Sequence, residues 1–593
     1  MKKIFENTIS KALAATVLST IYLVDISSQQ TWKFNFTGIT SEHRINLKDI
    51  QPPIPSDWTG YSYLVIEMRT TTPQRFSIWL YQPDETPARL MFHPYGQNVW
   101  LKASIPIRFF MGKDQSGTDL ASANNRRADS FWMSVWGPFT IPKNVEAIGF
   151  AMTYPVENAS LEIRSVRLSK QDEGSAFLEK MPVTDEFGQW AHADWPGKIK
   201  SKEQLEKELA DEAKSFGTAA SYGYCEYGGY KNTQTKATGF FRLEQVDGKW
   251  WFVDSHGHLF LSIGSNGAGV GFSQRLVETN PAHVLISKRL ESWGMTSGGA
   301  GKPYTVMMRW PRIEGANYLG MTDVYSDEFA RTIDETARKQ CEPLKNDPLL
   351  IGYFVGNEPA WDGRESEVVD MILAGPDNEI KKRLKEFLSA GDTPGRRREF
   401  VLGAFEKYLQ LICSAIKKYD PNHLNLGIRF GGSPSAGLLK TGRIFDVCSI
   451  NVYEYEPVAQ IERVYRYTGR PVLIGEFHIG VPENGLGAGL VQAMNQKERG
   501  IAYRYYVEQA AATAAFVGAY WFQWRDQPVL GRFDGENYNI GFVDVTDRPY
   551  KELVEAAKET HKRLYDVHAG KILPFSQRPK ASPAGTPRSP WDF

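Results

Sequence analysis

The chain of 593 residues is longer than one ordinary domain, and its apolar content of 42% is enough for several hydrophobic cores. Lysine plus arginine and aspartate plus glutamate are each 69, so the formal net charge is zero and does not favour nucleic acid or an anionic membrane as a partner. The four cysteines show no CxxC spacing and no zinc pattern with histidine, which argues against a disulfide framework or a structural zinc site.

The N-terminus has the pattern of a secretory signal, predicted over residues 1–28. Two lysines follow Met1, and a short apolar run extends from about residue 12 to residue 24. That run is too short to cross a bilayer, and no later segment has transmembrane composition. The alternative is an ordinary N-terminal helix. We therefore expect a secreted or periplasmic protein with no membrane partner.

Residues 30–168 are predicted to form an all-β sandwich that resembles a carbohydrate-binding domain. Short, partly alternating apolar runs such as 61–69 and 159–168 are separated by turn residues. Residues 169–240 are predicted to be a connector, with a solvated, charged helix near residues 200–210. Four tryptophans of the sandwich are candidates for stacking on sugars, although a core position is the more frequent role for any one of them: Trp79, Trp100, Trp132 and Trp136.

From residue 241 to residue 570, strand-like runs alternate with helical patterns, which predicts a (β/α)8 TIM barrel. The expected strands are 258–264, 295–299, 304–309, 350–357, 423–430, 446–453, 471–478 and 517–524. A charged insertion between residues 361 and 400 is expected to be a loop with a short helix over the cleft. The Pro- and Ser-rich tail, 571–593, is predicted to be disordered.

Two glutamates, Glu358 and Glu476, each end an apolar run in the predicted barrel. The carboxyl ends of barrel strands are where catalytic residues are placed. Pro359 is expected to hold Glu358 in an extended conformation. Two strand-end carboxylates facing one cleft suit retaining glycoside hydrolysis. We therefore expect Glu358 to be the acid/base and Glu476 to be the nucleophile.

Residues at other strand ends are the expected substrate-binding and supporting groups. Asn357 is expected to donate a hydrogen bond to the sugar 2-hydroxyl. Arg429 and Tyr453 are expected to contact Glu476, and Trp521 is expected to form the floor of a sugar subsite. His478 is a candidate hydrogen-bond donor to the substrate, with a satisfied core histidine as the alternative. The remaining candidates at these strand ends are Asn266 and Gln523.

The polar, glycine-rich loop 531–541 follows the eighth expected strand and is predicted to cross the cleft. Glu536 and Asn537 are expected to bind hydroxyl groups there. Glu536 is also the second candidate for a catalytic carboxylate, and its alternative role is to shape the loop through Arg532. No cofactor and no metal are expected, because no His/Asp cluster has ligand spacing.

Several motifs of the chain resemble glycoside hydrolase family 50, the β-agarases. The motifs that carry this resemblance are the runs 356–359, 473–478, 521–527, 531–538, 541–544, 252–260 and 185–189. The resemblance covers roughly residues 180–567 and implies hydrolysis of β-1,4-galactosidic bonds in agarose with retention. It also implies an N-terminal β-sandwich. After Glu358 the sequence Pro-Ala-Trp departs from the more polar run expected of agarases, so a related galactan stays open as the substrate.

Two alternatives to an agarase remain at this point. One is a retaining β-glycosidase that acts on another galactan or another β-linked glycan, and it differs only in its sugar subsites. The other is a non-catalytic carbohydrate-binding protein on a barrel scaffold, against which the presence of both glutamates argues. Oligomeric state and endo or exo action are not predicted by the sequence.

Overall fold

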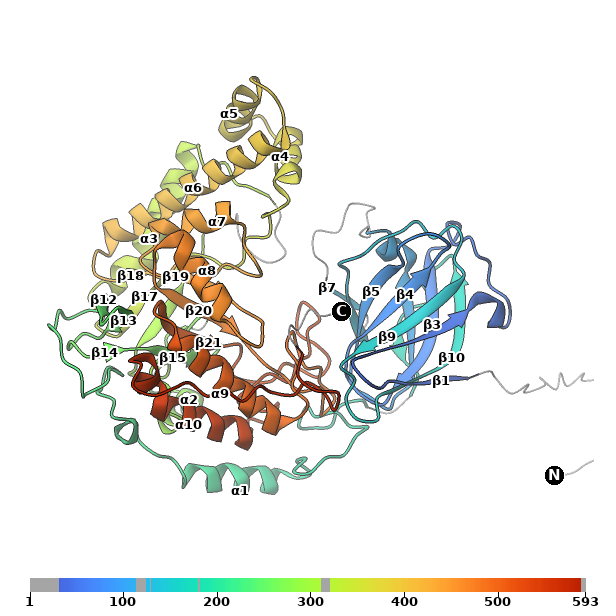
Figure 1. Ribbon diagram of the computed structural model, residues 1–593, viewed down its shortest axis with the longest axis horizontal. Coiled ribbons are helices and arrows are strands. Elements are labelled where there is room, and N and C mark those ends of the chain that lie inside the picture. The colour runs from blue at the N-terminus through green and yellow to red at the C-terminus, as the bar shows by residue number, and fades with distance from the viewer. Residues whose placement is uncertain are drawn as a thin grey trace, which may run out of the picture.

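The computed structural model describes residues 31–112, 124–127, 130–179, 182–272, 274–310 and 320–587. The chain has a mixed α/β fold whose N-terminal part is rich in sheet (Figure 1). The predicted signal, residues 1–28, lies outside the described residues. In the described part of the chain no helix is long and apolar enough to cross a membrane.

The N-terminal part, called here the two-sheet region, consists of two antiparallel sheets that share one core (Figure 1). The five-stranded sheet has the order β1-β10-β3-β6-β11, and the six-stranded sheet has the order β2-β9-β4-β5-β8-β7. Alternating residues of the central strands fill the core between the sheets, such as Leu64 and Ile66 of β3 and Ile78 and Leu80 of β4. The strands are β1 (Trp32–Asn35), β2 (Thr40–Asn46), β3 (Tyr63–Thr70), β4 (Phe76–Tyr81), β5 (Ala88–Pro94), β6 (Leu101–Pro106), β7 (Asn124–Arg127), β8 (Phe131–Ser134), β9 (Ala147–Thr153), β10 (Ser160–Ser169) and β11 (Ala176–Phe177).

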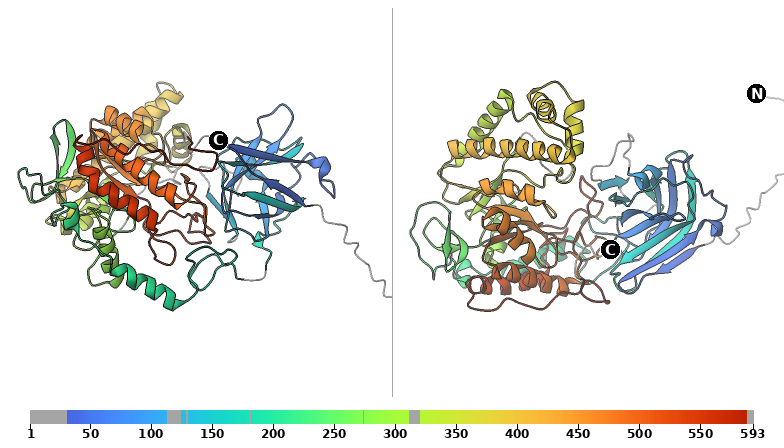
Figure 2. Two further views of the ribbon diagram at one scale, coloured as in Figure 1. Left: turned by 60° about the horizontal axis from the view of Figure 1, so that its bottom comes forward. Right: turned by 45° about the horizontal axis from the view of Figure 1, so that its top comes forward.

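A long connection with one helix, α1 (Lys202–Ala213), joins the two-sheet region to the rest of the chain along one side of the molecule (Figures 1 and 2). The side chain of Ser201 accepts a hydrogen bond from the backbone of Gln204 and caps this helix. None of the α1 residues is buried, as expected for the solvated, charged helix predicted near residues 200–210.

The remainder, called here the α/β region, contains two parallel sheets with the orders β15-β21-β20-β19 and β16-β17-β18. Every residue of β20 and β21 is buried, as expected for parallel strands covered by helices on both faces. A parallel bridge between Phe430 and Ile450 connects the two sheets. The strands are β15 (Ser262–Ser265), β16 (Tyr304–Met307), β17 (Leu350–Phe354), β18 (Leu424–Asn425), β19 (Cys448–Asn451), β20 (Val472–Phe477) and β21 (Phe516–Trp521).

Helices lie around these parallel strands (Figures 1 and 2). They are α2 (Pro281–Ser292), α3 (Asp327–Cys341), α4 (Glu365–Ala374), α5 (Glu379–Leu388), α6 (Pro394–Tyr419), α7 (Ala436–Thr441), α8 (Val458–Thr468), α9 (Gln496–Ala512) and α10 (Lys551–His568). A separate antiparallel sheet is formed by β12 (Arg242–Val246), β13 (Lys249–Val253) and β14 (Leu259–Phe260).

Three of the predicted elements differ from the structure. The expected strand 258–264 is divided, because β14 pairs with the antiparallel β13 whereas β15 pairs in parallel with β21. Residues 295–299 form no strand of their own, although the Thr296 and Ser297 amides donate to the Ile263 carbonyl of β15. The insertion after β17 holds two helices, α4 and α5, instead of one short helix, and both project from the body of the molecule (Figure 2).

The prediction of a disordered tail is wrong for residues 571–587, which pack on the α/β region. The Lys580 amide donates to Glu498 at 2.8 Å and the Phe575 amide donates to Glu508 at 2.9 Å. Ala581 is fully buried. Backbone groups make these contacts, and a composition poor in apolar side chains does not reveal them. Residues 588–593 of the predicted tail lie outside the described residues.

Candidate active site

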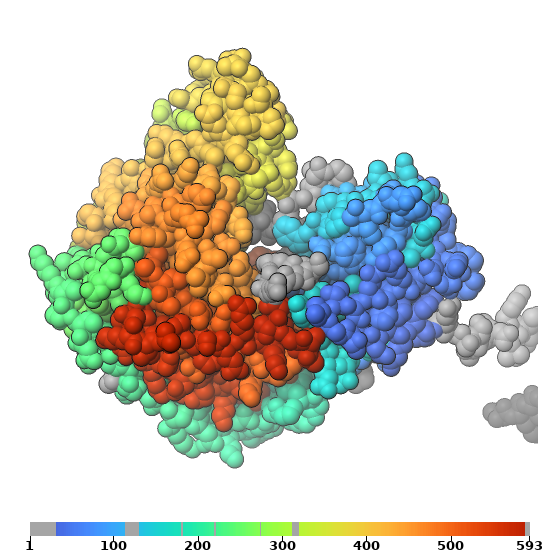
Figure 3. Space-filling view, in the orientation of Figure 1, coloured from blue at the N-terminus to red at the C-terminus, as the bar shows by residue number. Residues whose placement is uncertain are grey.

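Glu358 and Glu476 line the same cleft, which has a volume of about 980 Å³. Glu358 follows β17, and Glu476 lies in β20 near its carboxyl end. Residues from the two-sheet region line the cleft as well, so the site lies between the two regions. In Figure 3 the two-sheet region (blue) and the α4–α5 projection (yellow) stand on opposite sides of a hollow in the surface.

Both carboxylate oxygens of Glu476 are held by neighbouring side chains. The guanidinium of Arg429 donates to Oε1, and the hydroxyl of Tyr453 donates to Oε2. Arg429 is fully buried and also donates to the Gly475 carbonyl at 3.1 Å and to Asn266 Oδ1 at 3.3 Å. These charge-assisted hydrogen bonds orient the carboxylate, as a nucleophile in a fixed position requires. Arg429 and Tyr453 therefore lie where the sequence predicted them.

The backbone of Glu358 differs from the prediction. Glu358 has a φ of 50°, in the left-handed region, whereas the following proline was expected to hold it extended. The backbone amide of Glu358 donates to the Arg429 carbonyl at 3.1 Å, which fixes this conformation from the neighbouring strand end. A Cβ on Gly431 would lie 2.7 Å from Glu358 Cγ, so glycine is needed there. Such strained positions persist where surrounding contacts hold them and are frequent in active sites.

Asn451, which the sequence reasoning missed, holds the carboxylate of Glu358 and also contacts Arg429. Its Nδ2 donates to Glu358 Oε1 at 2.8 Å and to Asn357 Oδ1 at 3.1 Å. In the parallel pair of β19 and β20, Asn451 lies opposite Glu476. The signal for it was present, because Asn451 precedes Tyr453 by two residues in the predicted strand 446–453 and alternate residues share one face.

The surroundings raise the pKa of Glu358 to about 7. Desolvation in the cleft is the largest cause, and the negative charge of Glu476 is the second. The hydrogen bond from Asn451 acts in the opposite direction and lowers this pKa. Glu358, with its raised pKa, suits the role of an acid, and Glu476, bound by a guanidinium and a hydroxyl, suits the role of a nucleophile.

Glu536 lies in the cleft as predicted and is bound by its own loop. Gln527 donates a hydrogen bond to its Oε2 at 3.0 Å, and Arg532 forms an ion pair with the same oxygen at 2.6 Å. Burial raises the pKa of Glu536 to about 7, although the charge of Arg532 opposes this shift. These contacts favour the alternative that the sequence reasoning named, in which Glu536 shapes the loop through Arg532.

Three further candidates lie at or near the cleft. Asn266 lines it, donates to the Gly475 carbonyl at 3.0 Å and accepts from Arg429, so it orients that arginine. Gln523 lines the cleft and donates to the Arg525 carbonyl at 3.1 Å. His478 is buried, and its Nε2 accepts from the Leu490 amide at 2.9 Å. Burial lowers the pKa of His478 to about 3, so it is a neutral, hydrogen-bonded core histidine, the alternative role named for it.

Arg429, His478, Trp521 and Asn537 are not among the residues that line the cleft, and the last two make contacts within the core and the loop instead. Trp521 is 1% exposed, its indole N–H donates to the Ile540 carbonyl at 2.6 Å, and its ring packs against Phe477 and Phe542. The prediction that it forms a subsite floor is wrong, because at this strand end the indole points into the core. Asn537 is 1% exposed and donates to the Val529 carbonyl at 3.3 Å, so it stabilises the loop instead of binding hydroxyls.

The two-sheet region contributes aromatic residues to the cleft. Of the four tryptophans considered, Trp132 and Trp136 line the cleft, and Trp136 is 63% exposed. Trp132 stacks on His93 with ring centroids 3.6 Å apart. Trp79 and Trp100 are not among the lining residues, although Trp79 lies beside Arg89, which lines the cleft. Which face of a sheet meets a distant region cannot be read from alternation alone, so no sequence signal separated the two pairs.

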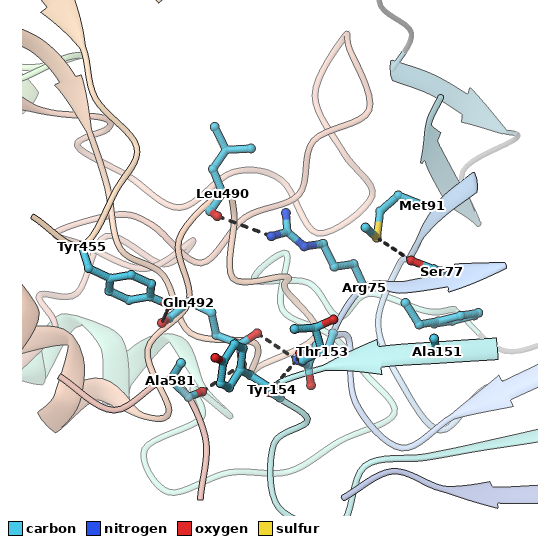
Figure 4. A pocket seen from close by; sticks show the side chains of 12 residues that line it. Arg75, Ser77, Met91, Ala151, Thr153, Tyr154, Tyr455, Leu490, Gln492 and Ala581 are labelled. Carbon is cyan, nitrogen blue, oxygen red and sulfur yellow. Dashed lines mark hydrogen bonds between the residues drawn. The ribbon is translucent and has the colours of Figure 1, made fainter. Parts of the chain in front are cut away.

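Hydrogen bonds fix the two-sheet region against the α/β region beside a small pocket of about 40 Å³ (Figure 4). Gln74 donates to Gln492 Oε1 at 3.0 Å, and Gln492 donates to the Ala581 carbonyl at 2.9 Å. Arg75 donates to the Leu490 carbonyl at 3.4 Å. The two-sheet region, the segment after β20 and the C-terminal tail therefore meet at this point.

Comparison with known proteins gives two curated relatives. No family model matches the chain. β-Agarase B of Vibrio sp. (strain JT0107) is 27% identical over 86% of this chain and 69% of its own length. β-Agarase A of the same organism is 26% identical over 67% of this chain and 53% of its own length. The chain is a glycoside hydrolase related to the β-agarases. The predicted resemblance to glycoside hydrolase family 50 is thereby confirmed.

Solved structures share the fold of this chain. PfGH50B aligns with a TM-score of 0.61 and 22% identity over 91% of this chain and 99% of its own. An exo-β-agarase aligns with a TM-score of 0.63 and 21% identity over 92% of this chain and 97% of its own. Both alignments include the two-sheet region, since they cover nine tenths of the chain.

Proposed function

We propose that the protein is a retaining β-agarase that cleaves β-1,4-galactosidic bonds of agarose or agaro-oligosaccharides. The relationship to β-agarases A and B supports the reaction and the substrate class. The observation that carries the mechanism is the pair in one cleft: Glu358, with a pKa raised to about 7, and Glu476, bound by Arg429 and Tyr453. A retaining glycosidase uses one carboxyl as acid/base and the other as nucleophile, and Glu358 and Glu476 are the two carboxyls that we assign to these roles.

The proposal includes a division into three parts: a β-sandwich over residues 30–168, a connector over 169–240 and a (β/α)8 barrel over 241–570. Support for the barrel comes from the continuous strand order. The sheet β16-β17-β18 continues through the Phe430–Ile450 bridge to β19, β20, β21 and β15. Backbone hydrogen bonds from residues 296 and 297 to Ile263 extend the order beyond β15. In such a barrel Glu358 and Glu476 follow strands four and seven, at the face where barrel active sites lie.

In the first step, protonated Glu358 donates its proton to the glycosidic oxygen while a carboxylate oxygen of Glu476 attacks the anomeric carbon. The bond from that carbon to the leaving oxygen breaks, and an ester between Glu476 and the sugar forms. In the second step, ionised Glu358 takes a proton from water, whose oxygen attacks the same carbon and releases Glu476. Two inversions at one carbon give net retention.

The change in the charge of Glu476 alters the pKa of Glu358 between these steps. Before the reaction, the negative charge of Glu476 raises the pKa of Glu358 and keeps it protonated. Once Glu476 is esterified, this charge is lost and the pKa of Glu358 falls. Glu358 then ionises and becomes the base that the second step needs. Asn357, which lines the cleft beside Glu358, is positioned as the donor to the sugar 2-hydroxyl.

In this proposal the substrate is a galactan outside the cell, and agarose is the first candidate. A related galactan is the second candidate, because Pro359, Ala360 and Trp361 depart from the run expected of agarases. The secretory signal proposed for residues 1–28 would deliver the enzyme to such a polymer. Products from agarose, porphyran and β-galacto-oligosaccharides, identified by mass, separate the two candidates.

The experiment that tests the function measures reducing-end release from agarose by the wild type, Glu358→Gln and Glu476→Gln. Each variant is expected to lose at least about 10³-fold in kcat, since each removes one half of a paired mechanism. Glu335→Gln changes an exposed glutamate of α3 and serves as the matched control. Retained turnover in either cleft variant would refute that residue's assignment. Binding of agarose without reducing-end release by the wild type would support the non-catalytic alternative.

A further inference from the structure

The two walls of the cleft carry opposite charge. On the α/β side the cleft is lined by four acidic residues, and Arg532 on that side is ion-paired with two of them, Asp534 at 2.8 Å and Glu536 at 2.6 Å. On the two-sheet side, the described lining residues include two arginines and no carboxylate; they are Arg75, Arg89, Met91, His93, Trp132, Ser134 and Trp136. A glycan in this cleft would therefore have acidic residues on one side and arginines on the other.

The basic wall is the outer face of the six-stranded sheet. Residues Arg89, Met91 and His93 alternate along β5, and their side chains project from the face opposite to the core residues Ala88 and Leu90. On β8 the cross-strand partners of Met91 and His93 are Ser134 and Trp132, which line the cleft as well. The strand pairing thus fixes the wall as one rigid surface and sets the positions of its charges.

Arg75 stands at the edge of this wall that meets the α/β region. Its guanidinium reaches from the start of β4 toward the segment after β20 and donates to the Leu490 carbonyl (Figure 4). Its charge acts on His93, His478 and Tyr538. The main charges acting on Glu358 are those of Glu476, Arg429 and Glu536. Arg75 therefore lines the cleft without being one of the main charges that act on Glu358.

Arg89 supplies the second charge of the wall. Its Nε donates to the Gly137 carbonyl at 3.1 Å, and its guanidinium carbon lies 5.6 Å from the centre of the Trp79 ring. Burial lowers the pKa of both Arg75 and Arg89, which means that the environment disfavours their positive charge. An anion in the cleft would offset this desolvation, and the guanidinium fork matches the geometry of sulfate and carboxylate oxygens.

We propose that the basic wall formed by Arg75 and Arg89 binds an anionic substituent of the galactan, so that the enzyme prefers substituted chains to neutral agarose. This inference rests on the proposed function. The shared chemistry is an oxyanion on a sugar next to the cleaved bond, carried either by a sulfate ester or by a carboxylate. The carboxylates of the opposite wall repel the same group, so the two walls orient the chain as well as bind it.

The test compares kcat/KM for oligosaccharides of equal length from agarose, from sulfated porphyran and from carboxylate-bearing pyruvylated agar. The wild type is expected to prefer one of the two anionic substrates, and the preferred one identifies the source of the oxyanion. Arg75→Gln and Arg89→Gln are each expected to lower the ratio of anionic to neutral kcat/KM by about tenfold, the order of one partly screened charge pair. Arg75→Lys should restore part of the ratio. Arg164→Gln, on the other sheet, is the matched control and should leave the ratio unchanged.

Equal kcat/KM for neutral and anionic substrates, with ratios that Arg75→Gln and Arg89→Gln do not change, would overturn this inference and leave the proposed function intact. Failure to cleave any galactan would overturn the proposed function instead. In that case the same oligosaccharides are titrated into the protein at low and high salt. If the anionic oligosaccharides bind more tightly than the neutral ones, if salt weakens this binding and if Arg89→Gln weakens it too, the proposed role of the basic wall is supported. Equal binding of neutral and anionic oligosaccharides refutes it.

Discussion

The guanidinium of Arg429 is paired with the carboxylate of Glu476, and both side chains are withdrawn from solvent. Arg429 reaches this position from a left-handed backbone conformation, with a φ of 54°, while its carbonyl accepts the amide of Glu358. One residue therefore fixes both glutamates, one through its side chain and the other through its backbone.

Replacing Arg429 by Met is expected to reduce kcat by at least about 10²-fold and to lower stability by ~3–5 kcal/mol, because a buried carboxylate loses its charge partner. Arg429→Lys keeps the charge but not the forked contact, and it should fall between the wild type and Arg429→Met. The measurements are steady-state kinetics on agarose oligosaccharides and denaturant unfolding. Wild-type kcat in Arg429→Met would show that Glu476 does not depend on this pair.

Gly475 is expected to tolerate no side chain. A Cβ there would lie 2.8 Å from Arg429 Nε and 2.9 Å from Asn451 Oδ1, so alanine would displace the groups that hold both glutamates. Gly475→Ala should therefore lower kcat more than it raises KM. The matched control is Gly403→Ala in α6, where a Cβ meets nothing within 4 Å; it should stabilise the helix by ~0.5–1 kcal/mol without changing activity. Equal activity in both variants would contradict the close packing around Arg429.

The pH dependence of activity follows from Glu358. Its folded pKa is about 7, above the ordinary 4.5, so the acid form is present below that pH and lost above it. We expect kcat/KM to fall as pH rises through about 7. Asn451→Ala removes a hydrogen bond that lowers this pKa, so the fall should move to higher pH. A fall that stays at the same pH in Asn451→Ala would contradict the assignment of the acid to Glu358.

The same shift has a consequence for stability. Because the pKa of Glu358 is higher in the folded chain, its contribution is fully present below the unfolded pKa of about 4.5 and is lost as pH rises through about 7. Glu358→Gln cannot ionise, so it should gain stability relative to the wild type as pH rises from 5 to 8. Thermal unfolding of both proteins at pH 5 and pH 8 measures this. A difference in Tm that does not depend on pH would contradict the raised pKa.

Two tryptophans should respond in opposite ways. Trp521→Phe loses the hydrogen bond to the Ile540 carbonyl in the core and should cost ~1–3 kcal/mol of stability with KM unchanged. Trp136→Ala removes an exposed, cleft-lining ring and should raise KM by about tenfold, the order of one lost aromatic contact, with little change in stability. A raised KM in Trp521→Phe with normal stability would restore the role first predicted for it.

The sequence was sufficient to find the parallel strands and both glutamates, because strands buried on two faces read as continuous apolar runs that end at the site. Contacts of Glu476 with Arg429 and Tyr453 were predicted for the same reason, since all three lie at strand ends. The left-handed backbone of Glu358 was not predicted. Proline disfavours the helical region for the preceding residue, and only the tertiary contact with the Arg429 carbonyl selects the conformation that is observed.

What the sequence could not supply depends on contacts between distant segments. The direction of the Trp521 ring depends on Phe542, and the order of the tail depends on backbone bonds to Glu498 and Glu508. The basic wall could not be predicted from the sequence for the same reason. Alternation along β5 predicts that Arg89 faces outward, but only docking against the α/β region turns that outward face into a wall of the cleft.

The central claim, that Glu476 attacks the sugar while Glu358 serves as acid and base, is tested most directly by trapping the ester. The wild-type enzyme is incubated with an activated 2-deoxy-2-fluoro-β-galactoside, digested, and its peptides are analysed by mass spectrometry. The account predicts one added sugar, on the peptide that contains Glu476 and at that residue. A label on Glu536 or Glu358, or turnover of the reagent with inversion at the anomeric carbon, would contradict it.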